Sequence, residues 1–204
     1  MDALENILNR VSARNLAEPY PSKDEMDTVY KAALRAPDHA WLRTSSFIEV
    51  KDKGLDKLSE IFVNYGKSIA DTSDEVLNKY KNAPYRAPMI IILVNSYKEH
   101  PKVPAIEQKL STATAAQNIM LALNAMEYSC IWRTGKMAFN EVIQTELGLE
   151  KNQEILGYLY IGTEVGKKKE IPNLDIDNFV SYLYIILVSK SGCKCHWSKH
   201  NFCN

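Results

Sequence analysis

The spacing of apolar residues along the chain predicts a series of amphipathic helices. Apolar positions at three- and four-residue intervals predict helices at about residues 4–11, 23–34, 55–69, 75–81, 104–127 and 140–147. Ser22 and Glu25 form a capping box at the start of the second helix, where each side chain satisfies a backbone N–H group. Pro37 is expected to end that helix, because the residue before a proline avoids the helical region.

Runs of apolar residues without alternation predict buried strands. Met89–Val94 is expected to form a central strand covered on both faces. Shorter runs at 47–50 and 155–161 predict two further strands. The small residues at 111–116 allow another backbone to approach the longest helix closely, so we expect that helix to be central. The sequence has no repeat, low-complexity tract or linker, and it predicts one α+β domain.

Composition and charge exclude some classes of function. The 204 residues suffice for one domain with a substantial core. Twenty-five basic residues balance 25 acidic ones, so the chain has no net positive charge that would attract nucleic acid or an anionic membrane. An anionic ligand must therefore be held by a local cluster of arginine or lysine. Residues 1–5 do not resemble a signal peptide, and the apolar run 182–188 is far shorter than the roughly 20 residues that span a bilayer. We expect a cytoplasmic protein.

The four cysteines fall into two groups. Cys130 stands among apolar and aromatic neighbours and is expected to be a small buried residue. The tail contains five residues of the types that bind zinc: Cys193, Cys195, His196, His200 and Cys203. Their spacing is too compressed for an ordinary zinc finger. We predict no metal site and a tail without organised structure, with zinc binding as the alternative.

Two clusters of charged residues could bind an anion. Arg10, Ser12 and Arg14 stand where the first helix gives way to a loop, and their guanidinium and hydroxyl groups could hold a phosphate. Alternatively, arginines at this spacing are simply solvated. Arg35 and His39 flank Pro37. They could act together on a ligand, or Arg35 could only complement the helix dipole while His39 lies at the surface.

A third candidate is Trp132-Arg133-Thr134-Gly135, which follows the longest helix and a short strand. Trp132 could equally be a core aromatic residue. Lys167-Lys168-Lys169 is expected to be a solvated loop. The sequence lacks the glycine-rich phosphate-binding motifs, the H-E-x-x-H metal motif and the G-x-S-x-G nucleophile motif.

Taken in order, these clusters resemble the flavin-dependent nitroreductase family. The resemblance rests on Arg10-x-Ser12-x-Arg14, Ala36-Pro37-Asp38-His39 and Trp132-Arg133-Thr134-Gly135, with the opening residues 1–5 and the segment 82–88. It is strongest for a minimal subgroup of NAD(P)H nitroreductases, and it covers roughly residues 1–182. The resemblance implies a nitroreductase-like α+β fold, in which helices surround a central mixed β-sheet, and a homodimer. It implies an FMN-binding domain at 1–182 and leaves 183–204 as a tail of unknown structure.

The resemblance also implies a function and a set of binding residues. It implies an oxidoreductase that passes hydride from NADH or NADPH through flavin N5 to a nitroaromatic, quinone or similar acceptor. The cofactor carries the chemistry, so no catalytic side chain is expected. The residues that the resemblance assigns to FMN are Arg10, Val11, Ser12, Arg14, Arg35, His39, Trp132, Arg133 and Thr134. His39 would reach the flavin from the neighbouring subunit, so the FMN site would lie at the subunit interface.

The chain departs from this family in two places. Val11 stands where a second arginine is expected, which leaves a backbone contact but removes one charge. After His39 the family usually continues to a Pro-Trp pair and a basic or aromatic residue, whereas this chain has Arg43-Thr44-Ser45-Ser46. We expect this change to remove a large apolar wall near the flavin and the substrate.

Two other functions stay open at this point. The first is a flavin-binding redox sensor or carrier without physiological turnover. The second is a structural α+β domain that assembles through its small-residue helix. The sequence does not decide between NADH and NADPH, and it does not name the physiological electron acceptor.

Overall fold

The computed structural model describes residues 2–183 of the chain. Contacts divide the chain into two compact units, Met1–Ile171 and Pro172–Asn204. The first unit contains the sheet and its covering helices, and the described part of the second contains one short 3₁₀ helix, η3 (Ile176–Asn178). The five cysteine and histidine residues of the tail that were considered as zinc ligands lie outside the described residues.

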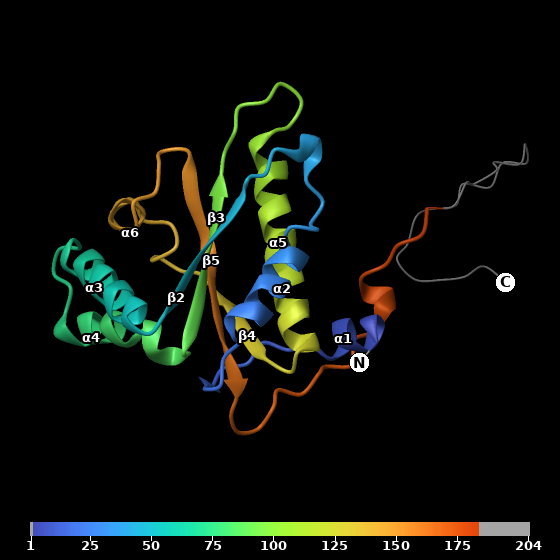
Figure 1. Cartoon of the computed structure of the whole chain (residues 1–204), viewed down its shortest axis with the longest axis horizontal. Helices are drawn as coiled ribbons and strands as arrows, with labels where there is room; N and C mark the ends of the chain where they lie inside the picture. The colour runs from blue at the N-terminus through green and yellow to red at the C-terminus, as the bar shows by residue number, and fades with distance from the viewer. Residues whose placement is uncertain (1, 184–204) are drawn as a thin grey trace, which may run out of the picture. The chain divides into compact units, whose positions relative to one another are not determined.

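The sheet is built around one long strand, β5 (Gln153–Glu164) (Figure 1). One edge of β5 pairs with β3 (Met89–Ser96), which in turn pairs with β2 (Ser45–Lys51). β5 also pairs with β4 (Ser129–Arg133) and, at its C-terminal end, with the two-residue strand β1 (Leu16–Ala17). These ladders are antiparallel, and a parallel bridge joins Ser12 to Cys130. The predicted α+β fold with a central mixed sheet is confirmed.

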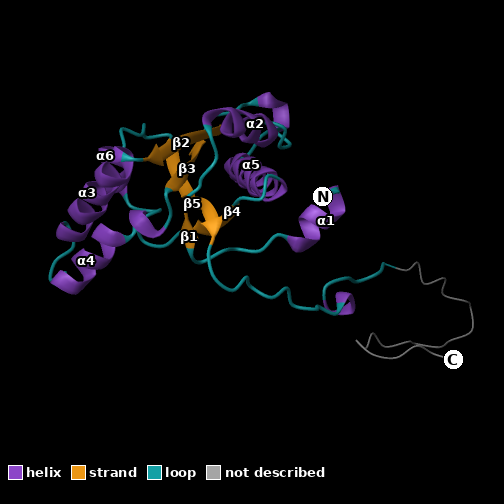
Figure 2. Cartoon of the chain, turned by 60° about the horizontal axis from the view of Figure 1, so that its bottom comes forward, coloured by secondary structure: helices purple, strands orange, loops and turns teal. Residues whose placement is uncertain are grey.

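Helices cover both faces of the sheet (Figure 2). One face is covered by α2 (Lys23–Ala33) and α5 (Ala105–Ala125), and the other by α3 (Lys53–Lys67), α4 (Asp74–Asn82) and α6 (Glu141–Glu146). The short helix α1 (Ala3–Asn9) lies beside α5, where the Asn6 side-chain amide donates to the Leu121 carbonyl at 2.9 Å. Among the described residues, no helix is long and apolar enough to cross a membrane.

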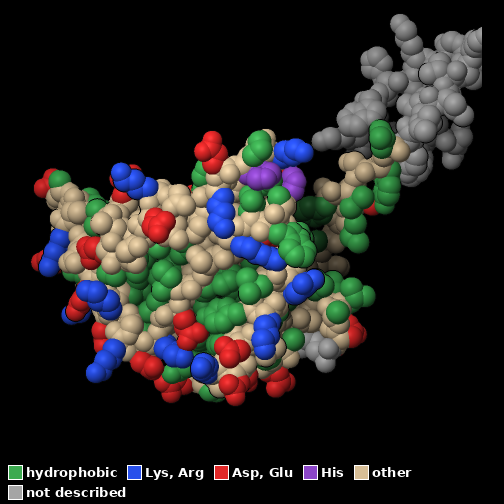
Figure 3. Space-filling model, turned by 45° about the horizontal axis from the view of Figure 1, so that its top comes forward, with side chains coloured by type: hydrophobic (Ala, Val, Ile, Leu, Met, Phe, Trp, Pro, Cys, Tyr) green, Lys and Arg blue, Asp and Glu red, His purple; other side chains and the backbone are tan. Residues whose placement is uncertain are grey.

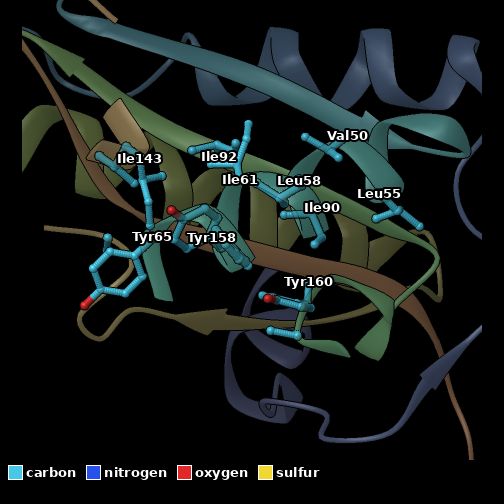
Figure 4. Packing of buried hydrophobic residues seen from close by; sticks show 14 of the residues in the cluster. Val50, Leu55, Leu58, Ile61, Tyr65, Ile90, Ile92, Ile143, Tyr158 and Tyr160 are labelled. Carbon is cyan, nitrogen blue, oxygen red and sulfur yellow. The ribbon is translucent and has the colours of Figure 1, made fainter. Parts of the chain in front are cut away.

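Alternate residues of β3 fill two separate cores, which confirms the predicted central strand. Ile90, Ile92 and Val94 pack toward α3, together with Phe62 and Tyr158. Figure 4 shows Ile90, Ile92 and Tyr158 within this core. The intervening residues of β3, Met89, Ile91 and Leu93, pack toward α2 and α5. All six are at most 1% exposed, because a strand covered on both faces has no polar side.

One predicted helix end is corrected by a contact distant in the sequence. The first helix ends at Asn9 rather than near Val11, because the bridge between Ser12 and Cys130 draws the chain into an extended conformation.

The second helix has the ends that the sequence predicts. The capping box of Ser22 and Glu25 is confirmed at the start of α2. That helix ends at Ala33 with Leu34 as its C-cap, ahead of Pro37. The Pro37 carbonyl accepts a hydrogen bond of 2.7 Å from Ser111.

Candidate functional site

The residues predicted to bind flavin lie near opposite ends of α5. Arg10 directly follows α1, which is tied to α5 at Leu121, whereas His39 contacts α5 at Glu107. Glu107 and Leu121 are separated by 14 residues of α5, and at about 1.5 Å rise per residue this is roughly 20 Å. We call the first group, residues 10–14 and 132–134, the arginine cluster, and we call residues 35–43 the His39 loop.

Pairing between the N-terminal segment and β4 brings two of the predicted motifs together. The chain leaves α1 at Arg10 in an extended conformation, and Ser12 bridges to Cys130. The Ala13 amide then donates to the Cys130 carbonyl at 3.2 Å. Ser12 therefore lies beside β4, the strand that ends with Trp132 and Arg133. The structure therefore brings the Arg10–Arg14 segment and the Trp132–Gly135 segment together, whereas the segment with Arg35 and His39 lies elsewhere.

Two guanidinium groups of the arginine cluster have buried donors that remain unused. Within residues 2–183, Arg10 Nη1 and Arg133 Nε are buried and have no hydrogen-bond partner. A buried charged donor without a partner is costly, and in native proteins such a group usually serves a ligand or a water molecule. The donors fit an anionic group such as a phosphate, which would accept charge-assisted hydrogen bonds from them.

The alternation of β4 gives Trp132 and Arg133 different surroundings. Trp132 packs against the core of α2 and α5, and its indole N–H donates to the Leu156 carbonyl at 3.2 Å. Gly157 makes room for it, because a Cβ there would lie 2.1 Å from Trp132 Nε1. The Arg133 guanidinium lies toward the other face, 5.5 Å from the ring centre of Tyr160. The side chain of Trp132 thus serves the core, and the Nε donor of Arg133 remains available to a ligand.

Cys130 is buried, as the sequence predicts. Burial raises the pKa of its thiol to about 12, and the charge of Arg10 opposes this only in part. The thiol is therefore neutral at physiological pH and unsuited to nucleophilic chemistry. Within the described residues, no group of three or more histidine, cysteine or acidic side chains is placed to hold a metal ion.

A hollow of about 290 Å³ opens beside the arginine cluster. It is lined by Ser12, Arg14, Asn15, Glu164, Lys167 and Lys169. The β1–β5 pairing forms it, since the Val165 amide donates to the Asn15 carbonyl at 3.1 Å. Three cationic side chains face one carboxylate, so the hollow favours an anion.

Lys167 and Lys169 are residues whose position the sequence analysis did not anticipate. Their run was expected to be a solvated loop, and Lys167 is indeed highly exposed and paired with Glu170 at 2.8 Å. The sequence does show three lysines just after the last strand, but their position alone does not indicate a binding site. The two-residue strand β1 pairs with β5 and brings Lys167 and Lys169 beside Ser12 and Arg14.

The His39 loop is held by α5 at two points. His39 Nδ1 lies 2.6 Å from Glu107 Oε2, and the Ser111 hydroxyl donates to the Pro37 carbonyl. Arg35, which follows α2, is exposed. The loop thus presents two exposed cationic or potentially cationic side chains, Arg35 and His39, and His39 lies near the N-terminal end of α5. Histidine side chains lie at the surface beside basic and hydrophobic ones (Figure 3).

The residues that follow the His39 loop contact α5. Thr44 is 1% exposed, and the Ser45 hydroxyl lies 3.0 Å from that of Thr112 on α5. Ser45 also lines a small hollow together with Asp38, Arg43 and Ser111. The loss of an apolar wall at this position stays a prediction. A large aromatic side chain lies nearby in the His39 loop. It belongs to Trp41, two residues after His39, which is 76% exposed. The sequence analysis missed Trp41.

Comparison with known proteins agrees with this architecture. The model of the nitroreductase family matches residues 7–163. The chain is 35% identical over 183 residues to the Escherichia coli K12 protein named "Putative NAD(P)H nitroreductase YdjA", which covers 89% of this chain and all of that protein.

Two solved structures share the fold at lower identity. A nitroreductase-like family protein from Bacillus cereus has a TM-score of 0.77 and 21% identity, and the match covers 90% of this chain and 96% of that one. A nitroreductase with bound FMN from Bacteroides fragilis has a TM-score of 0.69 and 22% identity, and the match covers 90% of this chain and 100% of that one. The resemblance inferred from the three motifs is confirmed: the chain belongs to the nitroreductase family.

Proposed function

We propose that this protein is an FMN-dependent oxidoreductase that oxidises NADH or NADPH and reduces a nitroaromatic, quinone or similar acceptor. The observation that carries the proposal is the pair of buried, unused guanidinium donors on Arg10 and Arg133. Family membership and the relative named as an NAD(P)H nitroreductase support the same activity. When bound, FMN would supply the hydride-transfer chemistry through its N5 atom, so the protein would bind and orient the cofactor and would need no side chain for acid–base catalysis.

The arginine cluster would hold the phosphate and the polar chain of the cofactor. Arg10 and Arg133 offer charged donors, Ser12 offers a hydroxyl, and Arg14 lines the adjacent hollow. Val11 would contribute through its backbone, and Trp132 and Thr134 belong to the segment expected along the flavin ring. These cations supply a local positive charge on a chain whose acidic and basic residues balance.

The separation of the two groups of residues supports a homodimer. Arg35 and His39 belong to a loop anchored about 20 Å along α5 from the attachment of α1. One cofactor can meet both groups most simply if the His39 loop comes from a second copy of the chain. Exposed apolar residues support such an interface, since Leu4 and Leu8 on α1 are 71% and 70% exposed and Ile106 and Leu110 on α5 are also exposed.

The activity is tested by purifying the full-length protein and measuring flavin released on denaturation. Anaerobic addition of NADH and NADPH in separate experiments should bleach the flavin absorbance with at least one nucleotide. Turnover with a nitroaromatic would separate a reductase from a flavin carrier. A protein that neither retains FMN nor binds it when FMN is added would contradict the proposal.

Subunit complementation tests the shared site. Homodimers of Arg10→Met and of His39→Ala should each bind FMN weakly, because every site has one defect. Coexpression of the two variants produces mixed dimers, in which one site collects both defects and the other has none. With random pairing, about a quarter of the sites should regain wild-type affinity. If each site is built within one chain, the mixture will show no recovery.

A further inference from the structure

The His39 loop keeps a large aromatic side chain in solvent by means of an unusual backbone. Trp41 is 76% exposed. Ala40, Trp41 and Arg43 have φ values of 56°, 54° and 54°, which residues other than glycine rarely adopt. Several such residues within a short segment indicate a conformation that the surrounding structure imposes, and such segments concentrate at functional sites.

Hydrogen bonds from three directions hold this backbone in place. The Asp38 carboxylate accepts from the amides of Leu42 and Arg43 at 3.1 and 2.8 Å. The Lys98 ammonium donates to the Leu42 carbonyl at 2.6 Å, from the loop after β3. Ser111 of α5 secures the start of the loop through the Pro37 carbonyl. The loop is therefore fixed while the indole that it presents is left uncovered in this chain.

A guanidinium group accompanies the indole. The Arg43 guanidinium carbon lies 4.9 Å from the centre of the Trp41 ring, in cation–π geometry. The Arg43 side chain is 54% exposed, and the Asp38 carboxylate 3.9 Å away already accepts two backbone amides. The pair thus offers an aromatic surface together with a cation whose donors make no hydrogen bond within residues 2–183.

We propose that Trp41 and Arg43 determine which acceptor the enzyme prefers, and that they select planar aromatic acceptors carrying an anionic group. The acceptor ring would stack on the indole, and its carboxylate or similar anion would pair with Arg43. The inference rests on the proposed function, because it places the His39 loop beside the cofactor bound by the partner chain. It assigns specificity to residues outside the set that the three motifs indicate.

The test uses two acceptors of nearly equal size, 4-nitrobenzoate and 4-nitrobenzamide, which differ in charge. Arg43→Gln should lower the ratio of their kcat/KM values about fivefold, because an exposed charge pair contributes modestly. Trp41→Ala should lower kcat/KM for both acceptors about fivefold, and Trp41→Phe should retain most of the activity. Lys57→Gln, a change to an exposed lysine on α3, is the control and should alter neither value.

Equilibrium binding gives a readout that does not depend on turnover. Titration of the flavin-loaded protein with 4-nitrobenzoate should quench tryptophan fluorescence, and Trp41→Phe should remove most of that quenching. Arg43→Gln should raise the Kd of 4-nitrobenzoate about fivefold and leave that of 4-nitrobenzamide unchanged. If nitroaromatics bind with this preference but are not reduced, the reductase proposal fails and the binding preference stands.

Three results would overturn the inference while leaving the proposed reductase intact. An acceptor ratio unchanged by Arg43→Gln would remove Arg43 from recognition. Equal quenching in the wild type and in Trp41→Phe would remove Trp41. Dissociation of the Trp41→Ala dimer, measured by light scattering, would show that the indole is covered by the partner chain and does not face the acceptor.

Discussion

Replacing Arg10 by methionine should weaken FMN binding and stabilise the flavin-free protein. The two effects have opposite signs because the buried Nη1 of Arg10 has no partner within the described chain. In the flavin-free state this donor has lost water and gained no hydrogen bond in return. In the flavin-bound state it would meet the phosphate. Methionine keeps an unbranched, flexible apolar stem and removes both the charge and the donors.

The magnitudes follow from the two environments. A buried unsatisfied donor costs about 1–3 kcal/mol, so its removal should raise the free energy of unfolding by about 1 kcal/mol, since Arg10 as a whole is only half-buried. A charge-assisted hydrogen bond to a phosphate contributes about 1.5–3 kcal/mol. Its loss corresponds to a roughly 10- to 100-fold increase in the Kd of FMN.

Urea unfolding of the flavin-free protein and fluorescence titration with FMN measure the two quantities separately. Lys57→Met is the matched control, because Lys57 is exposed and pairs with the similarly exposed Glu60 at 3.3 Å. It should change either free energy by less than about 0.5 kcal/mol. Lower stability of the flavin-free Arg10 variant would show that the guanidinium is satisfied without the ligand. An unchanged Kd would remove Arg10 from the site.

Three further predictions concern the framework of the site. Gly157→Ala should lower the free energy of unfolding in urea by about 3 kcal/mol or more, because φ is +143° and a Cβ would meet the Trp132 indole. The control is Gly148→Ala, at φ +73° with open space around it, which should cost only about 1 kcal/mol. Equal costs for the two variants would refute the argument from the indole. Because the pKa of the Cys130 thiol is raised, the stability that this group contributes is present below pH 9.0 and is lost as pH rises toward about 12. Cys130→Ala should therefore flatten the fall in the free energy of unfolding over that pH interval. The same pH slope in the variant and the wild type would contradict this prediction. Truncation after Tyr182 should preserve flavin content and NAD(P)H oxidation, because all predicted FMN residues precede it, and loss of both would make residues 183–204 part of the functional protein.

The sequence predicted most reliably those elements whose causes are local. The capping box of Ser22 and Glu25 involves groups three residues apart, and its hydrogen bonds form as expected. The unbroken apolar run 89–94, rich in β-branched residues, predicted a strand covered on both faces, and β3 forms there. In both cases the physical reason for the structure is contained in a few neighbouring residues.

The parts of the candidate site that were missed depend on contacts distant in the sequence. The two-residue strand β1 has no hydrophobic pattern of its own, and it exists because Leu16 and Ala17 pair with the end of β5. That pairing creates the hollow with Lys167 and Lys169. The exposure of Trp41 likewise follows from Lys98 and Ser111, which hold its loop from other elements. No periodicity in the sequence could reveal these contacts.

The hollow also changes the meaning of the departure at Val11. Judged by the family pattern, replacing an arginine with Val11 removes one cation from a phosphate-binding segment. The fold places Lys167 and Lys169 beside Ser12 and Arg14, more than 150 residues later in the sequence. Positive charge at this edge of the sheet therefore does not depend on position 11, because the lysines that follow β5 in the sequence supply it. A local motif with a missing charge can thus coexist with an anion-binding surface that the tertiary structure completes.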